Sequence, residues 1–192
     1  HVTNASDGIK QLQEAGIEVV IVEIGSTFDS VYESIEMIGK ATGKPTEAEQ
    51  IVTDMKDKVN ELQKKAEGIT ETKSVWVEIS PQPDIFTAGS GTYINEMLEM
   101  IRAVNVASDL EGWPQVNEEE AVNMNPDVIL TTYGYYVEDA REQILNRAGW
   151  QEVTAVKNEE VYDIDSDMVT RSGPRLVEGM EENAKAVYPD VF

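Results

Sequence analysis

The first 24 residues combine a helix-like pattern with a strand-like pattern. From Ser6, polar residues alternate with apolar ones at helical spacing until Gly16, which predicts a short helix that ends there. Residues 17–24 (IEVVIVEI) form a nearly continuous apolar run, typical of a strand buried on both faces of a parallel sheet. A single strand cannot make a sheet. The segment therefore either belongs to a lobe that starts earlier or pairs with another chain.

Two helices are predicted next. Residues 28–43 have a helical pattern, and residues 46–68 form a longer one in which Thr46 and Glu49 are placed as a capping box. At 1.5 Å per residue the second helix is roughly 34 Å long. It is either a surface helix or a rigid strut between two lobes. Its apolar stripe consists of Ile51, Met55, Val59, Leu62 and Ala66.

From residue 73 onward, strand and helix patterns alternate. This order is typical of an α/β fold, in which helices cover a sheet. We expect residues 69–192 to form a sheet of their own. The predicted strands are 74–79, 127–132 and 160–164, and the predicted helices are 92–104, 117–124, 137–147 and 174–187.

Composition excludes several classes of function. The 192 residues carry a formal net charge of −22, which argues against nucleic acid and against an anionic membrane surface. The acidity indicates solubility or a basic partner. There is no cysteine, and the only histidine is His1, which argues against thiolate zinc sites, catalytic triads and histidine-rich metal sites. No apolar run approaches a membrane span, and neither a signal peptide nor an initiator Met is present, as expected for a piece of a longer protein.

Two motifs resemble known ligand sites but lack residues that those sites require. AGSGTY (88–93) follows a strand pattern and opens a helix, but a dinucleotide fingerprint requires Gly where Ile94 stands, so a tight turn is expected, at the rim of a pocket. DIDSD (163–167) lacks the Gly and Glu of a calcium loop at the required spacing. No general acid/base pair can be identified among the 37 carboxylates. The sequence contains no enzyme signature.

The stretch EGWPQVNEEE (111–120) places a Trp beside a cluster of glutamates. Asn117 and Glu120 fit a capping box, and the three glutamates then fill the first turn of a helix, where its dipole favours negative charge. Trp113 is either a buried anchor under a loop or an exposed stacking surface.

The stretch DSDMVTRSGPR (165–175) lies between a predicted strand and the last predicted helix. Open α/β sheets place their ligand crevice at such a position. Asp167 and Arg171 are placed there to hydrogen-bond a polar ligand, or simply to pair with each other on the surface.

In this order, these signals resemble the cobalamin/iron-siderophore class of ABC-transporter substrate-binding proteins, and above all its vitamin-B12-binding members. The end of the first lobe is resembled by QLQEAGIEVVIV, and the start of the second lobe by VWVEISPQPDIFTAGSGTYINEML. The segments that carry the contact residues are resembled by W-P-Q-V-x-x-E and S-D-x-x-x-R-x-x-P-R. The resemblance implies two α/β lobes joined by one long helix, with the first ~70–90 residues of the class absent, since a normal lobe has about 100 residues or more. Residues 1–45 are then a remnant of the N-terminal lobe, 46–68 the interlobe helix and 69–192 the C-terminal lobe.

By the same resemblance the protein is not an enzyme and has no cofactor or bound metal of its own. It binds cobalamin or a related corrinoid outside the cytoplasm, in the periplasm or lipid-anchored, and delivers it to ABC permease subunits. Trp113 stacks on the corrin, Asp167 and Arg171 hold the polar edge of the ligand, and Glu119 docks on the permease.

Three alternatives stay open at this point. A ferric siderophore or haem is an alternative ligand, and for haem the iron ligand would come from the cluster Tyr133, Tyr135 and Tyr136. A small metal-dependent α/β hydrolase is the alternative from another class. A swapped or intertwined oligomer is the third, because strand 17–24 needs a partner.

Overall fold

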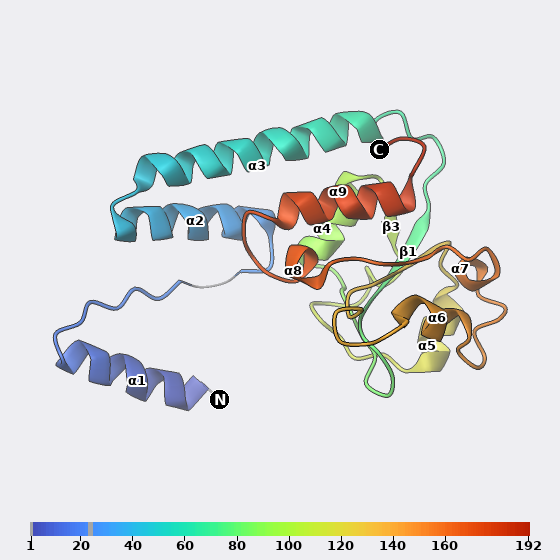
Figure 1. Ribbon diagram of the computed structural model, residues 1–192, viewed down its shortest axis with the longest axis horizontal. Coiled ribbons are helices and arrows are strands. Elements are labelled where there is room, and N and C mark those ends of the chain that lie inside the picture. The colour runs from blue at the N-terminus through green and yellow to red at the C-terminus, as the bar shows by residue number, and fades with distance from the viewer. Residues whose placement is uncertain (1, 23–24) are drawn as a thin grey trace.

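The structure is a computed structural model that describes residues 2–22 and 25–192. It is an α/β protein, as the sequence predicts, and its sheet lies within the C-terminal two thirds of the chain (Figure 1). Among the described residues, no helix has both the length and the apolar character needed to cross a membrane.

The central strand of the sheet is β1 (Ser74–Ser80). It runs parallel to β4 (Val128–Thr131), which in turn runs parallel to β5 (Val161–Asp163). These three confirm the predicted strands. On its other side β1 pairs with β3 (Val104–Asn105) in parallel and with β2 (Phe86–Thr87) in antiparallel orientation. The last two are too short to produce an alternating pattern and were not predicted.

Helices cover both faces of this sheet. Alternate residues of β1 point to opposite faces, so that Val75 and Val77 pack into one core cluster and Trp76 into the other. Several helices contribute to the first cluster, among them α3 (Pro45–Ala66), α4 (Tyr93–Met100) and α9 (Leu176–Val187). Three shorter ones contribute to the second: α5 (Glu118–Met124), α6 (Ala140–Leu145) and α7 (Thr154–Lys157).

Two of the predicted helices are shorter than expected for the same reason. The helix predicted at 137–147 begins only after Asp139, whose φ of 53° is left-handed. The helix predicted at 92–104 ends at Met100, shortly before Arg102, whose φ is 61°. A left-handed residue cannot continue a right-handed helix, and the apolar pattern alone does not reveal it. The one-turn helices α7 and α8 (Ser166–Val169) were not predicted.

The helix α2 (Phe28–Thr42) and the long helix α3 lie side by side (Figure 1). Gly43 ends α2 in the left-handed conformation, as the sequence indicates. The predicted capping box of α3 is wrong: the helix begins one residue before Thr46, at Pro45, and its first turn has no side-chain cap. A proline suits this position because its missing N–H would have no partner there. Four of the five predicted stripe residues are buried, while Ile51 is 39% exposed. The role of residues 46–68 between two lobes stays a prediction.

The predicted first helix is present as α1 (Val2–Glu14), and Gly16 follows it with a φ of 79°. The predicted strand 17–24 is wrong over residues 17–22, which form no β-pairing, and residues 23 and 24 lie outside the described residues. Ile17, Val20 and Ile21 are exposed, and no strand of the described part of the chain lies beside this segment. Figure 1 shows α1 apart from the other elements. An apolar run predicts a strand only where a partner strand is available. The division of the chain at residue 45 stays a prediction.

Candidate ligand-binding site

A cavity of about 640 Å³ lies beyond the carboxyl end of β1. It brings together Trp113 and Arg171, two of the residues that the sequence analysis selected, from segments that are far apart along the chain. Asp167 does not line it. The lining residues are Gly25, Ser26, Ile79, Tyr93, Trp113, Thr170, Arg171 and Ser172.

Trp113 is partly buried and packs against the core on the edge of this cavity. Its ring lies 5.5 Å from that of Tyr93, centroid to centroid, at a tilt of 60°. The hydroxyl of Tyr93 donates to the carbonyl oxygen of Thr170 at 2.8 Å, and burial raises the pKa of Tyr93. Both interpretations of Trp113 are therefore partly right: its indole is anchored on the core and also lines an open cavity. The two rings give the cavity a fixed aromatic wall.

The AGSGTY segment forms the predicted tight turn at the rim of the cavity. Gly89 lies so close to the next loop that a Cβ there would be 2.1 Å from the carbonyl oxygen of Leu110. Gly91 has a φ of 73°, and Thr92 caps α4 by accepting from the N–H of Asn95. The turn places Tyr93, the first residue of α4, against Trp113.

Asp167 and Arg171 form an ion pair with each other, through Oδ1 and Nε, and Arg175 lies 3.7 Å from the other carboxylate oxygen. The hydrogen bond from Arg171 lowers the pKa of Asp167, and the same bond raises the pKa of Arg171. Within the described part of the chain, Nη1 and Nη2 of Arg171 donate no hydrogen bond. Arg171 is thus oriented by Asp167 and keeps two donor groups for a ligand.

A second cavity, of about 420 Å³, adjoins this ion pair. Arg171 lines both cavities, so the two share one guanidinium group. This second cavity contains the predicted residue Asp167 and also Tyr135, which the sequence suggests only as a ligand of haem iron. Its lining residues are Tyr135, Asp163, Ile164, Asp165, Ser166, Asp167 and Arg171.

The three glutamates at the start of α5 have different surroundings. The predicted capping box is confirmed: the N–H of Glu120 donates to Asn117 at 2.9 Å, and Glu120 accepts from the N–H of Asn117 at 3.1 Å. Glu118 accepts a hydrogen bond from Gln82. Glu119 is exposed, and its carboxylate has no hydrogen bond or ion pair with any described residue. Of the three carboxylates, only that of Glu119 has no hydrogen-bond or ion-pair partner among the described residues.

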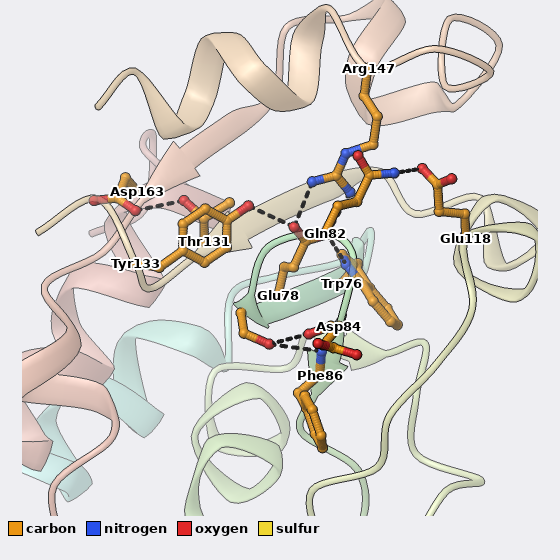
Figure 2. Close-up of polar contacts among 11 residues, drawn as sticks. Trp76, Glu78, Gln82, Asp84, Phe86, Glu118, Thr131, Tyr133, Arg147 and Asp163 are labelled. Atoms are coloured by element: carbon orange, nitrogen blue, oxygen red, sulfur yellow. Dashed lines mark hydrogen bonds and ion pairs between the residues drawn. The ribbon is translucent and has the colours of Figure 1, made fainter. Parts of the chain in front are cut away.

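A buried polar cluster around Glu78 was not predicted (Figure 2). Glu78, in the middle of the apolar strand β1, is fully buried and accepts two hydrogen bonds from Arg147 and one, of 2.6 Å, from the hydroxyl of Tyr133. Burial, together with the negative charge of Glu78, raises the pKa of Tyr133. A lone charged residue within SVWVEIS is the only signal in the sequence, and it does not identify the partners. Within the described residues, no group of three or more metal-ligating side chains is present.

Comparisons with known proteins identify relatives over nearly the whole chain. A family model described as "Periplasmic binding protein" matches residues 2–168. An uncharacterized ABC transporter substrate-binding lipoprotein of Bacillus subtilis, YvrC, is 49% identical over 98% of this chain and 59% of its own length. A cobalamin-binding protein of Halobacterium salinarum is 27% identical over 94% of this chain and 50% of its own length. The chain thus spans between half and three fifths of the length of these two relatives.

Solved structures share the fold over nearly the whole chain. A possible iron-binding (periplasmic solute-binding) protein of Staphylococcus epidermidis is 33% identical, with a TM-score of 0.86 over 96% of this chain and 71% of that chain. The periplasmic vitamin B12 binding protein BtuF of Vibrio cholerae is 21% identical, with a TM-score of 0.73 over 95% of this chain and 69% of that chain. The chain belongs to the periplasmic binding protein family.

Proposed function

We propose that this chain is part of the substrate-binding component of an ABC importer, and that it binds a corrinoid and delivers it to the permease without catalysing a reaction. The observation that carries the proposal is the position of Trp113, which lines a cavity of about 640 Å³ together with Arg171. A corrin ring is large, flat and apolar on its faces, and it carries amide groups around its edge. The Trp113–Tyr93 wall suits the faces and the guanidinium group suits the edge.

The relatives support this function in two ways. The Halobacterium relative is a cobalamin-binding protein, and the Bacillus relative is a substrate-binding lipoprotein of an ABC transporter. We infer an extracytoplasmic location, in the periplasm or on a lipid anchor, with the permease as the partner. Glu119 is our candidate for the docking contact, because its carboxylate is exposed and uncommitted. Asp167 then acts mainly by orienting Arg171.

The test is a titration of the full-length protein with cyanocobalamin, following tryptophan fluorescence and, in parallel, equilibrium dialysis. Within this chain Trp76 and Trp150 are fully buried in the core, and Trp113 lines the cavity. We expect saturable binding at micromolar ligand, with weaker quenching and lower affinity in Trp113→Phe. Absence of binding by dialysis would reject the corrinoid.

An iron-containing ligand, haem or a ferric siderophore, is the second candidate. Two observations favour it: the structural relative from Staphylococcus is a possible iron-binding protein, and Tyr135 presents its phenol beside Arg171. A phenolate oxygen is an established haem-iron ligand. Haemin titration followed by visible absorbance distinguishes the two candidates. If Tyr135 ligates iron, Tyr135→Phe removes the phenolate band, while Trp113→Phe leaves the band in place.

A further inference from the structure

Tyr135 lines the second cavity, and Tyr136 exposes its ring next to that of Tyr135. Their exposed fractions are 76% and 55%, and the ring centroids lie 4.7 Å apart in an edge-to-face arrangement. Tyr135 lines the cavity together with Arg171. The fold itself has no need for these rings on its surface, because neither belongs to a core cluster.

The loop that carries Tyr135 and Tyr136 is held by contacts with the buried Tyr133. The ring of Tyr136 lies 6.2 Å from that of the fully buried Tyr133, whose hydroxyl is fixed by Glu78 (Figure 2). The N–H groups of Tyr136 and Val137 both donate to the carbonyl oxygen of Tyr133, at 3.1 and 3.0 Å, which closes the turn. The buried cluster around Glu78 therefore holds the loop from within.

The end of β5 fixes the same loop from its other side. Asp163 accepts hydrogen bonds from the hydroxyl of Thr131, at 2.6 Å, and from the N–H of Gly134, at 3.0 Å. A Cβ at position 134 would lie 2.0 Å from the Asp163 carboxylate, so a larger residue there would displace this side chain. A surface loop fixed at both ends presents its exposed rings in one orientation, which lowers the entropy lost when a ligand binds.

Arg171 connects the two aromatic surfaces, since it lines the cavity of Trp113 and also that of Tyr135. We propose that Tyr135 and Tyr136 form a second aromatic wall of the ligand site, which binds a second flat ring of the ligand, outside the part that stacks on Trp113. The inference rests on the proposed function and narrows its ligand class. The site selects large ligands with two separate ring systems and a polar group between them for Arg171, and it disfavours small oxyanions and ligands without rings. In a corrinoid the second ring is the base of the nucleotide tail.

The test measures the affinity of the full-length protein, by equilibrium dialysis, for three probes: cyanocobalamin, dicyanocobinamide, which lacks the nucleotide base, and molybdate, which lacks rings. Stacking of a base on an aromatic side chain contributes enough that Tyr135→Ala should weaken cyanocobalamin binding by roughly five- to a hundredfold. Tyr135→Phe keeps the ring and should change the affinity by less than about twofold. All variants should bind dicyanocobinamide as the wild type does, because the contact is with the missing base.

Each other outcome overturns a defined statement. If the wild type binds cyanocobalamin and Tyr135→Ala binds it equally well, the second wall is wrong and the corrinoid function stands. If Tyr135→Ala weakened the binding of cyanocobalamin and of dicyanocobinamide equally, the contact with the base would be rejected. If Tyr135→Phe weakened cyanocobalamin binding as much as Tyr135→Ala does, the role would belong to the phenol oxygen instead of the ring. Binding of molybdate alone would reject the two-ring ligand but not the transport function. Binding of none of the three would reject the second wall and the corrinoid function together.

Discussion

Arg147 and Glu78 form a buried two-pronged ion pair, in which Nη1 lies 2.8 Å from Oε2 and Nη2 lies 2.7 Å from Oε1. Burial alone would lower the pKa of Arg147, but the carboxylate outweighs this effect and raises it. Glu78 belongs to β1 and Arg147 follows α6, so the pair joins the central strand to a helix on one face of the sheet. Through Tyr133 it also supports the loop that carries Tyr135.

Replacement of Arg147 by Met should strongly destabilise the protein. It leaves Glu78 charged and buried without its partner, which costs about 3–5 kcal/mol in the free energy of unfolding. Urea denaturation measures this loss. In the double variant Glu78→Gln/Arg147→Met a neutral amide replaces the carboxylate and still accepts from Tyr133, so much of the stability should return. If the double variant is no more stable than Arg147→Met, the charge of Glu78 is not the cause.

Gly89→Ala should destabilise the turn at the rim of the main cavity. The added Cβ would lie 2.1 Å from the carbonyl oxygen of Leu110, which is backbone and cannot rotate away. We expect a loss of roughly 1–3 kcal/mol, the usual effect of overpacking, in a urea denaturation experiment. Gly173→Ala is the matched control, because nothing lies within 4 Å of a Cβ at that position. Equal stability of the two variants would contradict the close approach.

How much of the fold the sequence predicts depends on whether local pattern and tertiary partner agree. The strand at residues 74–79 is predicted because burial on both faces produces a nearly continuous apolar run, which Glu78 interrupts. The run at residues 17–24 has the same pattern but no partner among the described residues, and it does not form a strand there. The helix predicted at 137–147 was too long because Asp139 adopts a left-handed conformation that its residue type permits without requiring it.

The same distinction between local pattern and tertiary partner applies to the residues of the site. The positions of Trp113 and Arg171 follow from the order of strands and helices, because an α/β sheet places both segments at one edge. The partnership of Glu78 and Arg147 joins residues 69 positions apart in sequence, and it cannot be selected from 37 carboxylates without the fold. The wall of Tyr135 and Tyr136 depends on exposure, which the sequence does not show. The ligand roles of Trp113, Asp167, Arg171 and Glu119 stay predictions.

Glu96 should make the stability pH-dependent. Its carboxylate accepts from the N–H of Phe28 at 2.7 Å and so joins α4 to the start of α2. Burial, and to a smaller extent the charge of Asp29, raise its pKa above the usual 4.5. The folded state therefore holds this proton more tightly than the unfolded state, and the Glu96 contribution to stability falls as pH rises from about 4.5 through the raised folded-state pKa.

The variant Glu96→Gln removes this charge and keeps an acceptor for the N–H of Phe28. It should unfold at a higher urea concentration than the wild type at pH 7, and the difference should shrink as the pH falls towards 4. Urea midpoints measured at several pH values give both quantities. A constant difference between the two proteins across this range would mean that ionisation of Glu96 does not affect folding.

Asp167 and Arg171 should affect ligand binding more than stability. Both side chains are largely exposed, so Arg171→Ala and Asp167→Ala should leave the urea midpoint nearly unchanged. Arg171 offers two free donor groups to the ligand, and its loss should weaken cyanocobalamin binding about tenfold, the usual effect of one charge-assisted hydrogen bond. Arg175→Ala is the matched control, because it removes a neighbouring cation that lines neither cavity. An equal loss of affinity in this control would indicate general electrostatic attraction instead of a contact with Arg171.

Glu119→Ala should weaken docking on the permease and leave ligand affinity intact. Glu119 is uncommitted, whereas Glu118 accepts a hydrogen bond from Gln82 and Glu120 closes the cap of α5. A charge at an exposed rim sets the orientation and the rate of association more than the affinity, so the effect should be a severalfold slower onset of transporter-stimulated ATPase activity. Glu118→Ala removes the same charge one residue away and should have the smaller effect. Equal effects of the two variants would show that the permease responds to the net charge of this helix start and does not contact Glu119 in particular.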